Sequence, residues 1–144
     1  MKSYDLSQYI LRKNSVLLFP LTREELEMLN EDEQKFSSYI KLPYFAKNQE
    51  KNELTEIINN VDMENDYWFL KSQWVIVDVK AKAIVGYLRL TQEDIWNIIV
   101  MQITKDECKD IEREDVLGLF YRFLAGNGYP NICVKYIDEV KSES

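Results

Sequence analysis

The chain has 144 residues, 46% of them hydrophobic, and carries 25 acidic against 18 basic side chains, a net charge of −7. This length and apolar content predict a single globular domain over residues 1–144 with a sizeable core. The negative charge argues against nucleic acid and anionic membrane as partners, because both bind basic surfaces.

Histidine is absent from the chain. This removes Ser-His and Cys-His nucleophile pairs and the commonest metal ligand, so we expect no metal site. Any proton transfer must then use a carboxylate, Tyr, Lys, Cys or water. Cys108 and Cys133 lie apart without a CxxC motif, which predicts two reduced thiols. No apolar run approaches the roughly 20 residues that span a bilayer, and the N-terminus does not resemble a signal peptide, so we expect a cytoplasmic protein.

The N-terminal third predicts a strand and a helix. Residues Met1 to Asn14 fit either a short helix or an arm that packs on the domain, and the residues leave both open. A short strand follows over Ser15 to Phe19 and ends at Pro20, which has no N–H to donate to a sheet. The segment Thr22 to Glu25 is a capping box, in which a threonine and a glutamate three residues later satisfy each other's backbone amides.

Two further apolar stretches precede the central strands. A charged interval over Glu31 to Lys35 predicts a solvated face or a turn, and apolar spacing resumes at Phe36. Asn52 or Thr55 is expected to cap the next helix. The apolar residues of that helix repeat at i, i+3, i+4 and i+7, the pattern of one buried face: Leu54, Ile57, Ile58 and Val61.

Three runs rich in β-branched and aromatic residues form the centre of the chain. They cover Trp74 to Val79, Ile84 to Leu90 and Ile95 to Ile103, with four-residue polar connections between them. This spacing predicts a three-stranded antiparallel meander. A helix is expected over Ile111 to Ala125, and a final strand over Ile132 to Ile137 lies parallel to the third run after a helical crossover.

The predicted order is strand, helix, helix, three strands, helix, strand, followed by a charged tail over residues 138–144. This order predicts the α+β class, with a mixed, mostly antiparallel sheet flanked by helices. Seven apolar positions are expected in its core: Ile57, Val61, Ile76, Leu88, Ile98, Phe120 and Phe123.

The order resembles that of the GNAT superfamily of N-acetyltransferases. The stretch Val16 to Asn30 looks like that family's first strand entering its first helix, and Trp74 to Val77 with Ile84 to Leu88 looks like the next two strands. The Ile-Val-Gly-Tyr run at residues 84–87 is the most family-like piece. The resemblance covers about Ser15 to Tyr136 and implies an acyl-CoA N-acyltransferase-like fold, here short at its C-terminus.

The resemblance also implies an activity. Family members move an acetyl group from acetyl-CoA to a small-molecule or peptide amine. By analogy, the backbone at Met101, Gln102 and Ile103 would pair with the pantetheine arm of acetyl-CoA, while Lys109 and Arg113 are the bases placed to meet its pyrophosphate.

No catalytic residue follows from the resemblance. The family's C-terminal region often supplies a tyrosine as general acid, and neither Tyr129 nor Tyr136 matches that position. Glu93 and Asp94 begin the predicted fourth family strand, where turn residues are the simpler interpretation.

The expected cofactor loop departs from the family. Its pattern, Arg/Gln-x-x-Gly-x-Gly/Ala, lets backbone amides approach the pyrophosphate. Residues 104–115 contain no glycine and carry six carboxylates against three bases. This degenerate loop predicts weak or absent binding of acetyl-CoA.

Two functional classes therefore remain. One is an acetyl-CoA-dependent N-acetyltransferase with an atypical cofactor loop. The other is a catalytically inactive domain of the same fold that works as an interaction or regulatory module, with a protein partner or as a homo-oligomer. A third alternative is one half of an assembly whose missing strands come from a partner chain.

Overall fold

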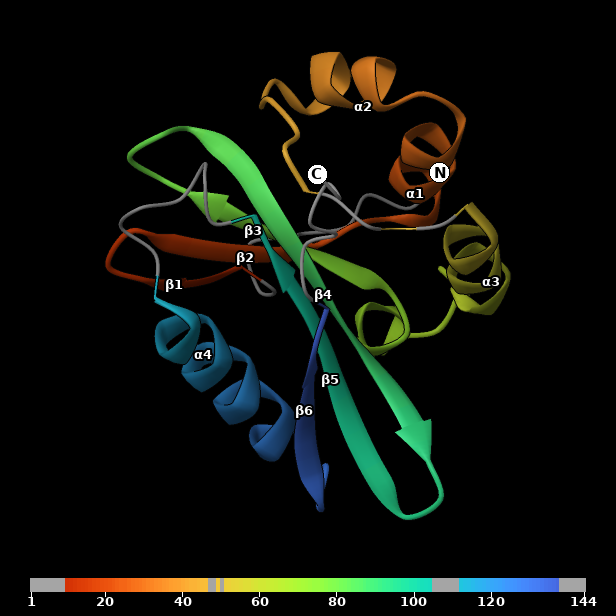
Figure 1. Cartoon of the computed structure of the whole chain (residues 1–144). Helices are drawn as coiled ribbons and strands as arrows, with labels where there is room; N and C mark the ends of the chain where they lie inside the picture. Colours follow the sequence, from red (N-terminus) through yellow and green to blue (C-terminus); the bar gives the residue numbers. More distant parts are fainter. Residues whose placement is uncertain (1–9, 47–48, 50, 105–111, 138–144) are drawn as a thin grey trace, which may run out of the picture.

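A computed structural model of the chain describes residues 10–46, 49, 51–104 and 112–137. Six strands form one sheet in the order β1-β2-β3-β4-β5-β6 (Figure 1). The strands are β1 Leu11–Lys13, β2 Val16–Pro20, β3 Gln73–Asp78, β4 Ala83–Glu93, β5 Trp96–Ile103 and β6 Ile132–Tyr136. The helices are α1 Arg23–Glu31, α2 Glu33–Ile40, α3 Lys51–Asn60 and α4 Arg113–Gly126, with a short 3-10 helix at Trp68–Leu70.

The sheet is mixed and mostly antiparallel, as predicted. Each strand from β1 to β4 pairs antiparallel with the next one. The last pair, β5 and β6, is parallel, with Asn97 opposite Ile132 and Met101 opposite Tyr136. The α+β class, the meander and the parallel final strand are thereby confirmed.

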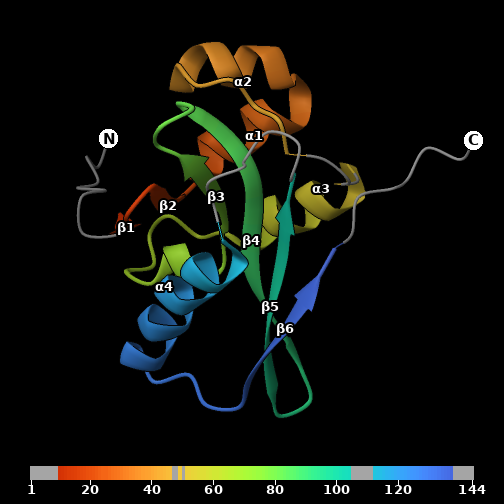
Figure 2. The same cartoon turned by 60° about the vertical axis from the view of Figure 1, so that its left-hand side comes forward.

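Helices cover both faces of this sheet. Figure 2 shows α4 on one side and α3 on the other, while the far end of the β4–β5 hairpin protrudes beyond the helices. The indole of Trp74 on β3 contacts the rings of Phe120 and Phe123 on α4, at centroid distances of 5.3 and 5.1 Å. Because side chains alternate along a strand, the neighbouring positions on β3 face the α1–α3 side.

Strand β1 was not predicted from the sequence. The expectation for Met1 to Asn14 was a short helix or an arm, whereas Leu11–Lys13 pairs with β2 through a hairpin that turns at Asn14. Asn14 has a φ of 54°, a left-handed conformation that asparagine tolerates better than most residues. The exposed Arg12 and Lys13 interrupt any apolar pattern, so the strand left little signal in the sequence. Residues 1–9 lie outside the described part of the chain.

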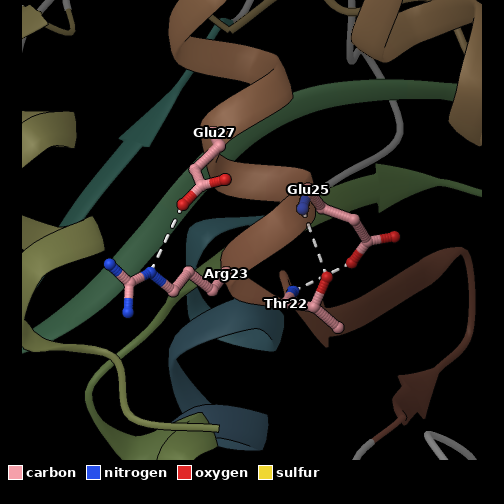
Figure 3. Close-up of polar contacts among 4 residues, drawn as sticks. All are labelled: Thr22, Arg23, Glu25 and Glu27. Atoms are coloured by element: carbon pink, nitrogen blue, oxygen red, sulfur yellow. Dashed lines mark hydrogen bonds and ion pairs between the residues drawn. The ribbon is translucent and has the colours of Figure 1, made fainter. Parts of the chain in front are cut away.

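The capping box at the start of α1 is confirmed (Figure 3). The amide of Glu25 donates to the Thr22 hydroxyl at 3.2 Å, and the amide of Thr22 donates to the Glu25 carboxylate at 2.9 Å. Burial raises the pKa of Glu25, against the hydrogen bonds from Thr22 that lower it. The charged interval after α1 is exposed and contains a break at Asp32, whose carboxylate caps α2 by accepting from Gln34 at 2.9 Å.

Two local expectations are wrong. Asn52 and Thr55 lie within α3, which begins at Lys51, so neither caps it. Strand β4 runs on to Glu93, and the hairpin turns at Asp94 and Ile95 instead of using the polar residues from Thr91 onward as a connection. These polar residues extend the strand because this part of the hairpin protrudes and its side chains are exposed.

Five of the seven residues predicted to lie in the core are confirmed as buried. Ile57, Val61, Ile76, Leu88 and Phe120 are buried. Ile98 and Phe123 are only partly buried, because Ile98 lies in the outer half of the hairpin and Phe123 lies beside the buried stripe of α4.

Candidate functional site

The three predicted cofactor residues on β5 lie at its C-terminal end. Met101, Gln102 and Ile103 are all buried. The amide of Ile137 donates to the carbonyl of Met101 at 2.8 Å, just beyond the last residue of β6. Strand β5 continues past this bond to Ile103, which pairs with Gly86 on β4. The β5 edge that the resemblance implies for the pantetheine arm is thus occupied by β6 as far as Met101.

Arg113 comes close to this strand end. It is the first residue of α4, and its guanidinium lies 4.7 Å above the ring of Tyr136, the residue opposite Met101. The Nε of Arg113 is buried and has no hydrogen-bond partner within the described part of the chain. The structure therefore brings Arg113 and the end of β5 together around Tyr136. Lys109 lies outside the described residues.

The N-terminus of α4 is acidic. Glu112 is the N-cap residue without a side-chain capping bond, and Glu114 and Asp115 occupy the first turn. Asp115 also pairs with Lys13 on β1, at 3.3 Å. These carboxylates interact favourably with the helix dipole and need no ligand to do so.

The opposite face of the sheet carries a row of polar side chains, of which the sequence analysis named only Gln102, and that residue for its backbone. We call Gln73, Tyr87, Arg89, Gln102 and Thr104 the polar row. Cross-strand pairing brings its members side by side, since Gln73 lies opposite Arg89 and Tyr87 lies opposite Gln102. All of them except Arg89 are fully buried.

Hydrogen bonds satisfy both ends of the polar row. The amide of Gln102 donates to the Thr104 hydroxyl at 3.1 Å, and this hydroxyl donates to the carbonyl of Phe45 at 2.9 Å. At the other end, the side-chain amides of Gln73 and Gln49 donate to each other. The segment that contains Phe45 thus closes over the row and pairs with Ile84 on β4.

Tyr87 is held as a neutral phenol at the centre of the row. Burial and then the negative charge of Glu53 raise its pKa to about 12, against the opposing effect of Arg89. Burial also raises the pKa of Tyr44, with a further contribution from the charge of Glu33. Tyr87 is therefore a proton donor at neutral pH and is unsuited to act as a general base.

Arg89 forms an ion pair with Glu53 on α3, and only about a fifth of each side chain is exposed. The pair lies in the wall of a cavity of about 320 Å³ between α3 and the outer part of β4. A second hollow of about 840 Å³ follows near the turn of the β4–β5 hairpin, and the two share Leu70, Gln92 and Tyr129. One sequence signal could have indicated this site, namely that Arg89 interrupts the otherwise apolar run from Ile84 to Leu90, two residues after Tyr87.

The other candidate features from the sequence give less support for a functional site. Glu93 and Asp94 are exposed at the hairpin turn, as the simpler interpretation predicted. Within the described residues there is no group of three or more Cys, Asp or Glu side chains that could hold a metal ion. No helix in that part of the chain is long and apolar enough to cross a membrane.

No protein-family model matches the chain, and no curated protein matches it either. The solved structures to which it is similar include acetyltransferases. A ribosomal-protein-S5-alanine acetyltransferase from Vibrio fischeri has 11% identity and a TM-score of 0.47, with 87% of this chain and 72% of that one covered. An aminoglycoside acetyltransferase from an uncultured soil metagenomic sample, in complex with sisomicin, has 13% identity and a TM-score of 0.46, with 88% and 80% covered.

A GNAT-family acetyltransferase from Bacillus anthracis has 8% identity and a TM-score of 0.45, with 82% of this chain and 67% of that one covered. This is the family that the sequence resembles.

Proposed function

We propose that this domain binds acetyl-CoA weakly and transfers its acetyl group to an amine. The observation that supports the proposal is the meeting of Arg113 with the end of β5 around Tyr136. The resemblance implies contact with the cofactor for Arg113 and for the end of β5. These two come from elements, α4 and β5, that are separate in the sequence. The Arg113 guanidinium has a free Nε–H to offer an anion within the described structure.

In this proposal the cofactor lies along the end of β5. Gln102 and Ile103 continue the strand beyond the last bond to β6, so their backbone would meet the pantetheine arm. Arg113, with Lys109, would meet the pyrophosphate. Acetyl-CoA held there would supply the acetyl group to the amine, with a C–N bond formed, the C–S bond broken and the amine proton passed to the released thiol of CoA. We assign no catalytic residue to the proton transfer and place the reaction in the cytoplasm.

The expected affinity is low for a physical reason. Residues 104–115 contain no glycine, so successive amides are not free to approach a phosphate closely. Glu112, Glu114 and Asp115 already bring negative charge to the N-terminus of α4. Losing about 4 kcal/mol of phosphate contacts would weaken a micromolar ligand to about millimolar.

An NMR titration with acetyl-CoA tests the proposal, because it measures dissociation constants in the millimolar range. We expect saturable shifts and an affinity several-fold lower for Arg113→Ala. The matched control is Arg122→Ala, which removes an exposed arginine from the same helix and should leave the affinity unchanged. Equal affinities for Arg113→Ala and the unmodified chain would contradict the assigned cofactor edge, and a low micromolar dissociation constant would contradict the expected weakness.

A second candidate function is an interaction or regulatory module that binds no cofactor. It is favoured by the closed polar row, in which Gln102 and Thr104 are fully buried and bonded within the protein. Incubation with acetyl-CoA and a panel of amines, followed by mass spectrometry, separates the two functions. An acetylated amine supports the transferase, whereas no product together with no acetyl-CoA binding supports the module, whose partner is then a protein or a second copy.

A further inference from the structure

The cavity beside α3 is built around two opposite charges. Glu53 on α3 and Arg89 on β4 form an ion pair in its wall. Charges removed from water are costly unless each one faces an opposite charge or several hydrogen-bond partners. With such a pair in its wall, the cavity can therefore bind a ligand without leaving a charge unpaired only if the ligand's own charges sum to zero.

The helix presents a second carboxylate to the same cavity. Glu56 follows Glu53 by three residues, so both lie on one face of α3. Glu56 is exposed, and Lys71, on the segment that precedes β3, also lines the cavity. The four charged residues of the lining, two acidic and two basic, sum to zero.

Part of the lining is apolar. Ile57 and Leu70 are buried beneath the cavity, while Leu90 and Tyr129 are half-buried at its sides. Such surfaces favour an aliphatic or aromatic group, since burial of apolar area stabilises the bound state. A volume of about 320 Å³ suits a molecule of amino-acid size.

We infer that this cavity binds a small zwitterion with an apolar side chain, the chemical class of leucine, methionine or phenylalanine. The ligand's carboxylate pairs with the Arg89 guanidinium, whose planar fork suits two parallel hydrogen bonds. Its ammonium group pairs with Glu53, released from Arg89, and with Glu56. Each charge of the internal ion pair exchanges one partner for another, so the cavity stays neutral.

This inference does not rest on the proposed function. Binding to the cavity needs no acetyl-CoA, and the Arg89 and Glu53 side chains belong to different elements from Arg113. Its test is therefore carried out with the full chain and no cofactor, so that failure of one proposal leaves the other unaffected.

Isothermal titration with L-leucine, L-methionine and L-phenylalanine gives the first test. We expect saturable binding of at least one of them at concentrations up to about 10 mM. For leucine, two analogues each lack one charge, namely leucinamide without the carboxylate and 4-methylpentanoate without the ammonium group. Each should bind about tenfold to a hundredfold more weakly, because a charged group in the cavity loses its partner.

Charge-changing variants give the second test. The measured quantity is the preference among leucine and its two analogues, which would not change if Glu53 and Arg89 had a merely structural role. Glu53→Gln leaves Arg89 as excess positive charge, so the preference should shift from leucine towards 4-methylpentanoate. Arg89→Gln leaves Glu53 and Glu56, so the preference should shift towards leucinamide. The control is Glu24→Gln, which makes the same change at an exposed position of α1 outside the cavity and should keep the original preference.

Thermal unfolding of each variant identifies those that remain folded, and ligand preference is compared among these. Opposite shifts in preference for the two variants support the inference. No saturable binding by any of the three amino acids would overturn it, as would equal affinity for leucine and both of its analogues.

Discussion

Gly86 on β4 lies so close to the backbone of Gln102 on β5 that a side chain at position 86 would collide with the Gln102 carbonyl. The close approach occurs beside an irregularity in the pairing of β3 with β4, between Ile76 and Val77. Gly86 therefore lets β4 and β5 pass close together at the place where β5 reaches its predicted cofactor edge.

Gly86→Ala should destabilise the domain by about 1 to 3 kcal/mol or more, because the colliding atoms belong to the backbone and cannot rotate away. Urea unfolding measures the loss. The matched control is Gly118→Ala in the middle of α4, where an added methyl group meets nothing within 4 Å. That change should stabilise the domain by roughly 0.5 to 1 kcal/mol, since alanine favours a helix.

Phe120→Ala should cost about 3 to 5 kcal/mol, much of the stability of a typical domain. Phe120 is fully buried and its ring contacts those of Trp74 and Phe123, so truncation leaves a cavity between α4 and the sheet. Thermal unfolding is the measurement. Tyr121→Ala, at the exposed neighbouring position, should shift the melting temperature far less. Equal shifts for the two variants would mean that the register of α4 differs from the one described.

Thr22→Ala should lower the free energy of unfolding by about 1 kcal/mol, because it leaves the Glu25 amide without its capping acceptor. Chemical denaturation is accurate enough to detect this difference. Ser38→Ala, at an exposed position inside α2, is the control and should be neutral or slightly stabilising. A neutral result for Thr22→Ala would contradict the capping role.

The domain should lose stability as pH rises from about 10 to about 12. The pKa of Tyr87 is raised from its ordinary value of 10.0 to about 12, so over this range the unfolded chain releases the phenol proton while the folded chain keeps it. The neutral phenol thus favours the folded state fully below pH 10, and this advantage disappears as pH passes the folded pKa. Tyr87 should account for roughly 1 to 2 kcal/mol of the loss.

Urea midpoints at pH 9 and pH 11.5 measure this effect. In Tyr87→Phe the urea midpoint should decrease less between these two pH values than in the unmodified chain. In Tyr39→Phe, a change at an exposed position, the decrease should be the same as in the unmodified chain. An identical alkaline loss in Tyr87→Phe and the unmodified chain would show that other groups cause it.

Much of the fold follows from local patterns in the sequence. The three central runs predict strands because β-branched and aromatic residues fill them, and the i, i+3, i+4, i+7 spacing from Leu54 predicts the buried face of α3. Thr22 and Glu25 predict the start of α1 because a capping box depends only on residues three apart. Strand β1 gave no such signal, since Arg12 and Lys13 are exposed and its pairing with β2 alone makes it a strand.

The candidate sites depend on contacts between distant parts of the chain. The sequence identifies Met101 and Arg113, but their meeting around Tyr136 results from the parallel pairing of β5 with β6 and the position of α4. Likewise, the pairing of Arg89 with Glu53 requires both the register of β4 and the docking of α3 on that face of the sheet. Local propensity fixes which residues form a strand or a helix, whereas register and docking minimise the free energy of the whole core, so only the tertiary structure decided which charges share a cavity.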